Sequence, residues 1–369
     1  MSSLSRRRLL ASTTAGFALN ALGPAWQGRG DDAAATAPQK PASPPVDPYL
    51  DAVLVDGEPP LPQAGCFTFA VLPDTQFYSQ RHPELFLAQT EWIAAQRDAR
   101  RITGVFHLGD ITHNNTPQQW ENARRAMKIL DDAHMPYCMV PGNHDYGKGG
   151  QATDRTTLLN ETFPIAGCRN RPGWGGTYDR EPDRVDNTFQ FMEAGGRKFL
   201  VLGLEFGPRA DVIRWANEVV GDHRDHEVIL LTHVFVYHDD TRYDWAKYQN
   251  KQAGNPHKYP VAKATGDDVH DGEQLWQKLV SRHRNFILTI NGHVLDDGLG
   301  RLVTASQGRE IPQQLVNFQM RPNGGDGWLR LIEMRPDGTA QTYDYSPTRS
   351  QHNESLQNQF AFRVPTVGA

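Results

Sequence analysis

Four consecutive residues of this chain combine side chains that together can bind a metal ion and transfer a proton. Gly142-Asn143-His144-Asp145 supplies an amide, an imidazole and a carboxylate in one short run. The run comes one residue after the apolar segment 137–140, which is typical of a short buried strand. We therefore expect these polar groups to lie at the end of a strand, where they suit a functional site better than a core.

Four other apolar runs also end close to a residue that can bind a metal ion. The runs span residues 67–72, 105–108, 228–232 and 286–290, and the polar residues that follow them are Asp74, Asp110, His233 and His293. Helical segments lie between several of these runs, which is the pattern of a largely parallel sheet. Ligands of such sheets bind at the carboxyl ends of the strands. We therefore expect five side chains to meet in one place: Asp74, Asp110, Asn143, His233 and His293.

A cluster of carboxylate, amide and imidazole groups predicts a bound divalent metal, with zinc, manganese and iron as the candidates. A single ion rarely needs so many groups, whereas two ions that share a bridging carboxylate do. Such two-metal centres commonly serve phosphate-ester hydrolysis. Each motif alone also fits an ordinary role, because a Gly-Asp pair often forms a turn and a lone histidine is often structural. The five motifs together, in this order, favour the metal centre.

The order of the motifs resembles that of the calcineurin-like metallophosphoesterases. In that family the series runs Asp-x-His, Gly-Asp, Gly-Asn-His-Asp or Glu, a lone His, and Gly-His-x-His. The corresponding residues here are Asp74-Thr75-Gln76, Gly109-Asp110, Gly142-Asn143-His144-Asp145, His233 and Gly292-His293-Val294-Leu295. The resemblance covers about residues 67–295. The ordered set is specific to the family but not to one substrate.

The resemblance implies how the ligands are shared between two divalent ions. Asp110 would bridge the two ions. Asn143, His233 and His293 would complete the coordination of one of them, and Asp74 would belong to the other.

The resemblance also implies a catalytic pair, His144 and Asp145. His144 would not bind metal but would stabilise the transition state or protonate the leaving oxygen. Asp145 would orient His144. Because a metal-activated water would attack phosphorus in line, the expected activity is hydrolysis of phosphate mono- or diesters.

Two positions depart from the family pattern, and both normally serve the ion held by Asp74. Gln76 stands where the family usually has a histidine, and Leu295 stands where it has its last histidine. Gln76 can bind weakly through its side-chain carbonyl, but Leu295 cannot bind at all. The second site can be retained with an altered metal preference, which we favour, or be absent, or recruit another residue. The candidates for recruitment are His113, Asn114, His238, Asp296 and Asp297.

Two other functions are compatible with these departures. One is an exported hydrolase that acts on another ester with a single metal ion. The other is a non-catalytic binding module on the same fold. The intact His144 and Asp145 weigh against a pure binder, which needs neither an acid nor its orienting carboxylate.

The pattern between the motifs favours an α/β fold. The expected helices span residues 84–99, 116–130 and 209–220, a hairpin is expected over 188–202, and later strands near 315–320, 328–334 and 340–345. The resemblance implies two face-to-face mixed β-sheets flanked by helices, with 65–300 as the phosphoesterase domain and 301–369 as strands that complete the sandwich. The long segments 146–186 and 236–271 directly follow ligand motifs, so we expect them to rim the site and contact substrate.

The N-terminal residues resemble an export signal. Ser5-Arg6-Arg7-Arg8-Leu9-Leu10 places arginines before a moderately apolar stretch, as in twin-arginine signals. We expect residues 1–27 to be this signal and 28–64 to be a linker rich in Ala and Pro. The apolar stretch is too polar for a stable membrane span. The protein is therefore expected in the periplasm or outside the cell.

The composition limits which classes of molecule the protein is expected to bind. The net charge of −5 gives no electrostatic case for nucleic-acid binding, so a phosphate-ester substrate is the partner that we expect. The 369 residues suffice for one large domain. The sequence leaves the oligomeric state open.

Overall fold

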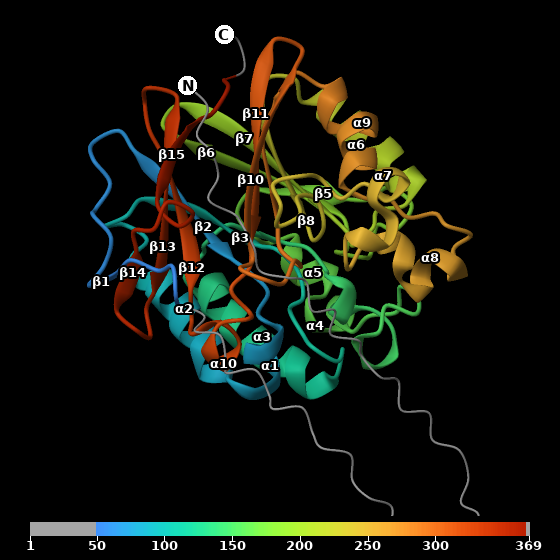
Figure 1. Cartoon of the computed structure of the whole chain (residues 1–369), viewed down its shortest axis with the longest axis horizontal. Helices are drawn as coiled ribbons and strands as arrows, with labels where there is room; N and C mark the ends of the chain where they lie inside the picture. The colour runs from blue at the N-terminus through green and yellow to red at the C-terminus, as the bar shows by residue number, and fades with distance from the viewer. Residues whose placement is uncertain (1–48, 367–369) are drawn as a thin grey trace, which may run out of the picture. The chain divides into compact units, whose positions relative to one another are not determined.

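The computed structural model describes residues 49–366, which form two β-sheets packed face to face with helices on their outer surfaces (Figure 1). The expected export signal, residues 1–27, lies outside the described residues. Within the expected linker, Leu54–Asp56 form strand β1, which pairs with β14 (Gln351–Asn353). The folded part of the chain therefore begins earlier than the sequence predicted.

The eight-stranded sheet joins the N-terminal strands to the C-terminal ones, in the order β1-β14-β13-β12-β2-β3-β4, with β15 also paired to β13. Strands β2, β3 and β4 run parallel to one another, and β12 pairs antiparallel with β2. The bounds of these strands are β2 Phe67–Leu72, β3 Ile102–His107, β4 Tyr137–Met139, β12 Leu329–Met334, β13 Thr339–Ser346 and β15 Phe360–Arg363.

The seven-stranded sheet has the order β10-β11-β9-β8-β7-β6-β5. Strands β7, β8, β9 and β11 run parallel to one another. Strand β10 pairs antiparallel with β11, β6 pairs antiparallel with β7, and β5 pairs antiparallel with β6. The bounds are β5 Trp174–Thr177, β6 Thr188–Ala194, β7 Arg197–Leu204, β8 Glu227–Thr232, β9 Phe286–Asn291, β10 Leu299–Ser306 and β11 Arg309–Val316.

The central strands are apolar on both faces because each face is covered. In β2, Phe69 and Val71 lie in the core between the sheets, whereas Ala70 and Leu72 pack against helices. The alternation follows from the two-residue period of a strand. Across the interface the ring of Phe69 meets that of Phe199 of β7 at 5.3 Å between centroids. Burial on both faces explains why these strands appear in the sequence as continuous apolar runs.

Helices cover the outer faces of the two sheets. Side chains of α2 and α3 pack on the eight-stranded sheet, and side chains of α6, α8 and α9 pack on the seven-stranded one. The bounds are α1 Gln76–Arg81, α2 Pro83–Ala95, α3 Pro117–Asp132, α4 Leu159–Thr162, α5 Ile165–Cys168, α6 Ala210–Asp222, α7 Trp245–Tyr248, α8 Pro260–Ala264, α9 Gly272–Lys278 and α10 Pro322–Gly325. Within residues 49–366 no helix combines the length and the apolar character needed to cross a membrane.

The fold class that the sequence predicted, two mixed sheets flanked by helices, is confirmed. The hairpin is also confirmed as β6 and β7, joined by Gly195 and Gly196 at φ 58° and 74°, the left-handed conformation that a tight hairpin turn requires. The strand expected at 315–320 is wrong from Asn317 onwards, because β11 ends at Val316 and the chain turns into the site there. The strands that follow β9 divide between the sheets: β10 and β11 extend the seven-stranded sheet, and β12 to β15 extend the other.

Candidate metal centre

Five parallel strands end at one region of the molecule and deliver the side chains that the sequence singled out. Asp74 follows β2, Asp110 follows β3 and Asn143 follows β4, all in the eight-stranded sheet. His233 and His293 follow β8 and β9 of the other sheet. All five side chains are buried. The carboxyl ends of both sheets thus contribute to one centre, as expected for parallel strands.

Three of these residues form a compact group of possible metal ligands. His233 Nε2 lies 3.2 Å from Asp110 Oδ1 and 3.2 Å from His293 Nδ1. One ligand atom from each of the three residues lies within 4.8 Å of the others, and residues 49–366 contain no other such group of three or more His, Cys, Asp or Glu. A carboxylate and two imidazoles are the ligands that zinc, manganese and iron accept.

Asn143 supplies a fourth possible ligand. Its Oδ1 is buried and has no hydrogen-bond partner among the described residues. The next residue, His144, donates its backbone N–H to Asp110 Oδ1 at 2.9 Å, which holds this segment against the Asp110 carboxylate. A buried carbonyl oxygen without a partner is costly, and a metal ion satisfies it. The donor set of Asp110, Asn143, His233 and His293 therefore fits a divalent ion.

Each histidine of the group is oriented by a backbone carbonyl. His233 Nδ1 donates to the carbonyl oxygen of Leu108 at 2.7 Å, and His293 Nε2 donates to that of Gly254 at 2.9 Å. The nitrogen left over in each ring is the one that faces the centre. Such outer contacts fix both the ring orientation and the tautomer of a metal-binding histidine.

Two glycines of the motifs are required by close approach. At Gly109, where φ is +97°, an added Cβ would lie 2.6 Å from the ring of His233. At Gly142 it would overlap the carboxylate of Asp110. Asp110 itself has φ +47° and His293 has φ +75°. Left-handed backbone at non-glycine residues is strained and clusters at functional sites, which agrees with a centre built for chemistry.

The ionisable side chains of the group shift one another's pKa values. Burial alone lowers the pKa of His233, but the carboxylates of Asp110 and Asp74 outweigh burial and raise it to about 9. Burial raises the pKa of Asp110, but the neighbouring His233 and His144 reverse this and hold it well below its usual range. Burial and the neighbouring His233 lower the pKa of His293 to about 3. The Asp110 carboxylate and a proton on His233 therefore favour each other.

The Asp74 side of the centre is organised differently. Both carboxylate oxygens of Asp74 accept the backbone N–H of His293, at 3.1 and 3.0 Å, and Oδ2 also accepts from Asn317 Nδ2 at 3.0 Å. Gln76, the expected weak ligand, is the first residue of α1. Its amide donates to Gln319 Oε1 and its carbonyl accepts from His113 Nδ1.

Leu295, which stands where the family has its last histidine, is 47% exposed. The residues expected to replace that missing ligand have other partners. His238 Nδ1 lies 3.4 Å from Asp296 Oδ2, and Asp297 Oδ1 accepts the N–H of Leu299. The carbonyl oxygen of the Asn114 side chain accepts from Gln80 and Gln119.

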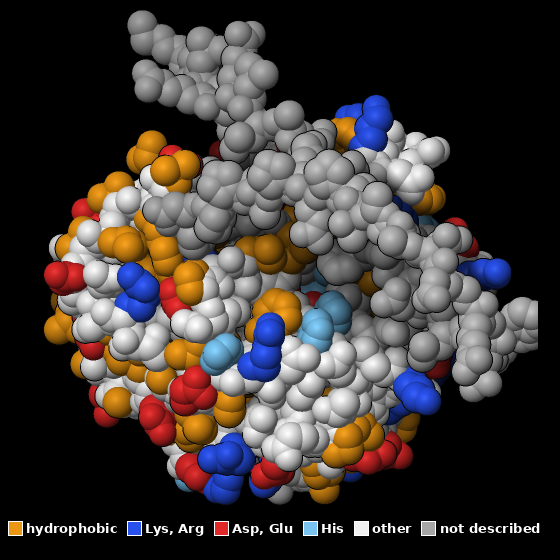
Figure 2. All heavy atoms as spheres, turned by 60° about the horizontal axis from the view of Figure 1, so that its bottom comes forward, with side chains coloured by type: hydrophobic (Ala, Val, Ile, Leu, Met, Phe, Trp, Pro, Cys, Tyr) orange, Lys and Arg blue, Asp and Glu red, His pale blue; other side chains and the backbone are white. Residues whose placement is uncertain are grey.

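His144 is half-buried beside the centre. Its Nδ1 donates to the carbonyl oxygen of His113 at 2.9 Å, and the two rings stack at 4.8 Å between centroids, with planes inclined by 20°. His113 in turn contacts the ring of Phe77 at 5.0 Å. Figure 2, which brings the lower side of Figure 1 forward, shows histidine side chains reaching the surface near the middle of that face, beside hydrophobic ones.

Asp145 does not contact the His144 ring, so the expectation that it orients His144 directly is corrected. Its carboxylate accepts the backbone N–H groups of Ile111, Thr112 and Gly142 at 2.8 to 3.0 Å and the Thr112 hydroxyl at 2.9 Å. These bonds fasten the loop after β3 to the loop after β4. The backbone carbonyl of His113 orients His144 instead.

Asn317 and Gln319 are the contacts of the centre that the sequence interpretation missed. Both follow β11, which ends at Val316 beside β9. Asn317 Nδ2 also donates to the carbonyl of Val294, which ties this turn to the segment after β9. A signal was present, because a polar residue directly after an apolar strand is the pattern that identified the other members of the centre.

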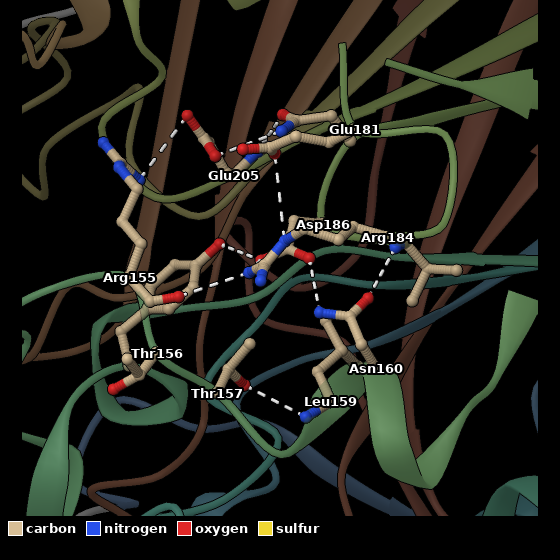
Figure 3. A network of polar contacts seen from close by, with 12 residues as sticks. Arg155, Thr156, Thr157, Leu159, Asn160, Glu181, Arg184, Asp186 and Glu205 are labelled. Carbon is tan, nitrogen blue, oxygen red and sulfur yellow. Dashed lines mark hydrogen bonds and ion pairs between the residues drawn. The ribbon is translucent and has the colours of Figure 1, made fainter. Parts of the chain in front are cut away.

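The segment 146–186 is fastened to the seven-stranded sheet by a network of ion pairs (Figure 3). Glu205, which follows β7, lies 3.5 Å from Arg155 and 2.8 Å from Arg209. Asp186 accepts from Arg184 at 2.8 Å and from Asn160 at 2.8 Å. The charges shown there pair with one another, so they anchor the segment.

The segment 236–271 contributes directly to the centre. Gly254 accepts from His293, and the rings of Tyr243 and Tyr259 lie 6.1 and 6.2 Å from the His293 ring. Arg242, which lies in the same segment, points away into an ion pair with Glu273 at 2.6 Å. The expectation that this segment borders the site is therefore met by its aromatic residues and a backbone carbonyl.

Two comparisons with protein sequences agree with this geometry. The sequence model of the calcineurin-like phosphoesterase family matches residues 67–297. The uncharacterized protein YvnB of Bacillus subtilis is 28% identical over 308 residues, which are 80% of this chain and 21% of that protein. The DNA double-strand break repair protein Mre11 of Haloferax volcanii is 31% identical over 166 residues, 42% of this chain and 37% of that protein. The chain thus spans about a fifth and about a third of the length of these relatives.

The similarity to solved structures is weaker. A purple acid phosphatase, PPD1 from yellow lupin, has a TM-score of 0.44 and 12% identity, covering 83% of this chain and 55% of that one. The NAD nucleotidase of Haemophilus influenzae has a TM-score of 0.39 and 11% identity, covering 81% of this chain and 49% of that one. The family match spans most of the chain and includes every motif of the centre. The chain is therefore a member of the calcineurin-like phosphoesterase family, a family of metal-dependent phosphoric ester hydrolases.

Proposed function

We propose that the protein hydrolyses phosphate mono- or diesters with a divalent metal ion held by Asp110, Asn143, His233 and His293. The observation that carries the proposal is the buried Oδ1 of Asn143, which has no partner among the described residues and lies on the segment bonded to Asp110. A divalent ion bound there lowers the pKa of its water towards neutrality and neutralises charge on the phosphoryl oxygens.

His144 supplies the proton in this proposal. Because its Nδ1 is committed to the carbonyl of His113, Nε2 is the ring nitrogen left to face a leaving oxygen. Asp145 keeps the loop that carries His144 fixed against the loop that carries Asp110.

The experiment is hydrolysis of an aryl phosphate monoester and an aryl phosphate diester by the full-length protein, supplied in turn with manganese, zinc or iron. We expect turnover of at least one ester and loss of turnover in Asn143→Ala together with loss of bound metal. His134→Asn is the matched control, since His134 is exposed at the turn before β4, away from the carboxyl ends of the strands. A metal-loaded protein that turns over neither ester would contradict the proposal and favour a binding module.

Export through a twin-arginine route is part of the same proposal. The support is Arg6, Arg7 and Arg8 before a moderately apolar stretch. Replacing all three with lysine in the full-length chain should retain the protein in the cytoplasm of a bacterial host. Equal export of both forms, measured by cell fractionation, would reject this route.

A further inference from the structure

The family pattern places a second metal ion on the Asp74 side of the centre, and the residues of this chain do not fit one. A second ion would need ligand atoms free to turn towards it. On this side, hydrogen bonds within the protein already occupy the side chains that would have to supply those atoms.

The carboxylate of Asp74 is engaged at both oxygens. The backbone N–H of His293 lies 3.1 and 3.0 Å from them, and Asn317 Nδ2 donates to Oδ2 at 3.0 Å. An added Cβ at Gly292 would overlap Oδ1, so the backbone lies directly against this carboxylate. Asp74 thus holds the segment after β9 and the turn after β11 together.

Gln76 is engaged at both ends of its amide. Its Nε2 donates to Gln319 Oε1, and its Oε1 accepts from His113 Nδ1 at 2.9 Å. Gln76 is 2% exposed and Gln319 is 6% exposed. This chain of side chains, Gln319 to Gln76 to His113, occupies the side of the centre where the family has a metal-binding histidine. It ends on the ring that stacks against His144.

The last family ligand is replaced by a side chain that cannot coordinate. Leu295 is 47% exposed, and among residues 49–366 no carboxylate or imidazole joins Asp74 in a group of three. By contrast, on the other side of the centre none of the described residues donates a hydrogen bond to Asn143 Oδ1. The difference between Asp74 or Gln76 and Asn143 lies in the partners of these side chains and not in their burial, since all three are buried.

We propose that the centre binds one metal ion. The hydrogen-bonded side chains of Gln319, Gln76 and His113 take the position of the second ion, and they hold His144 in its orientation. This inference rests on the proposed function for the identity of the first site. It replaces the expectation that a second site is retained with an altered metal preference.

The test is the number of metal ions per chain in the full-length protein loaded with manganese and freed of excess metal. The count comes from elemental analysis, and electron paramagnetic resonance shows whether the ions are magnetically coupled. We expect one ion per chain with the spectrum of isolated Mn²⁺. The double variant Gln76→His with Leu295→His restores both family ligands, and we expect two ions with an exchange-coupled spectrum.

Two ions per chain in the unaltered protein would overturn the inference while leaving the proposed function intact. A double variant that still holds one ion would overturn the assignment of Gln76 and Leu295 as the residues that exclude the second. Leu295→His alone, at an exposed position, guards against misfolding of the double variant and should still hold one ion. Absence of any ion would instead contradict the proposed function.

Discussion

The two sides of the metal centre differ in how their polar atoms are satisfied. On the side of Asn143 and His233, a buried carbonyl oxygen has no donor within residues 49–366, and the ring nitrogens of His233 and His293 face each other at 3.2 Å. On the side of Asp74 and Gln76, the carboxylate and the amide have protein partners. The comparison shows that a ligand site is recognised by buried polar atoms that have no hydrogen-bond partner within the described residues. Side chains of the same types whose polar atoms are already hydrogen-bonded hold neighbouring segments together instead.

Removing a ligand from the Asn143 side should have the largest effect. We expect His233→Ala to abolish metal binding and hydrolysis, a greater loss than the roughly 10- to 100-fold that the loss of an outer contact costs. Gln76→Ala should keep the metal and much of the activity. Elemental analysis and kcat/KM of both variants test the contrast, and loss of the metal in Gln76→Ala would reverse the assignment of the two sides.

His144→Ala should lower kcat by roughly 100-fold or more, the range that a positioned general acid contributes, without changing the metal content. The rate should fall least for esters with good leaving groups, because their leaving oxygen departs without being protonated. An unchanged kcat on every ester would remove His144 from the mechanism. His134→Asn again provides the control.

Metal affinity should fall as the pH falls, because a proton on His233 competes with the ion. The carboxylates of Asp110 and Asp74 outweigh burial and raise the pKa of His233 to about 9. At neutral pH, binding must therefore release that proton, and affinity should weaken by up to about tenfold per pH unit below 9. Calorimetry in buffers of different ionisation enthalpy measures the release. Binding without proton release at pH 7 would show that His233 is already neutral.

The smallest effect is expected from the support on the Asp74 side. His113→Ala removes the ring that stacks on His144 and bonds to Gln76, and we expect kcat to fall by roughly tenfold with the metal retained. His113→Phe keeps the stack and should recover much of that loss. Equal defects in both variants would mean that the bond to Gln76, and not the stack, positions His144.

The sequence predicted the members of the centre that lie directly after parallel strands. Asp110, Asn143 and His233 each follow an apolar run, and the local pattern is enough to place them at the same edge of the fold. The two-sheet architecture was predicted by the resemblance rather than by periodicity. Periodicity did predict the helices α2, α3 and α6 to within four residues at each end.

The rest depended on contacts between distant parts of the chain. Asn317 bonds to Asp74 from 243 positions away, and residues 315–320 looked like one continuous strand because Phe318 and Met320 are apolar. The partners of Asp145 are backbone N–H groups, which leave no mark in a sequence. The pairing of β12 with β2 is likewise set by the packing of whole faces, and local periodicity does not encode it.

The most direct measurement is a crystal structure of the full-length protein grown with manganese, with the ions located by anomalous scattering. The account predicts one strong anomalous peak, coordinated by Asp110, Asn143, His233 and His293, and no peak between Asp74 and Gln76. A peak of equal strength beside Asp74, or a single peak that Asn143 does not coordinate, would contradict it.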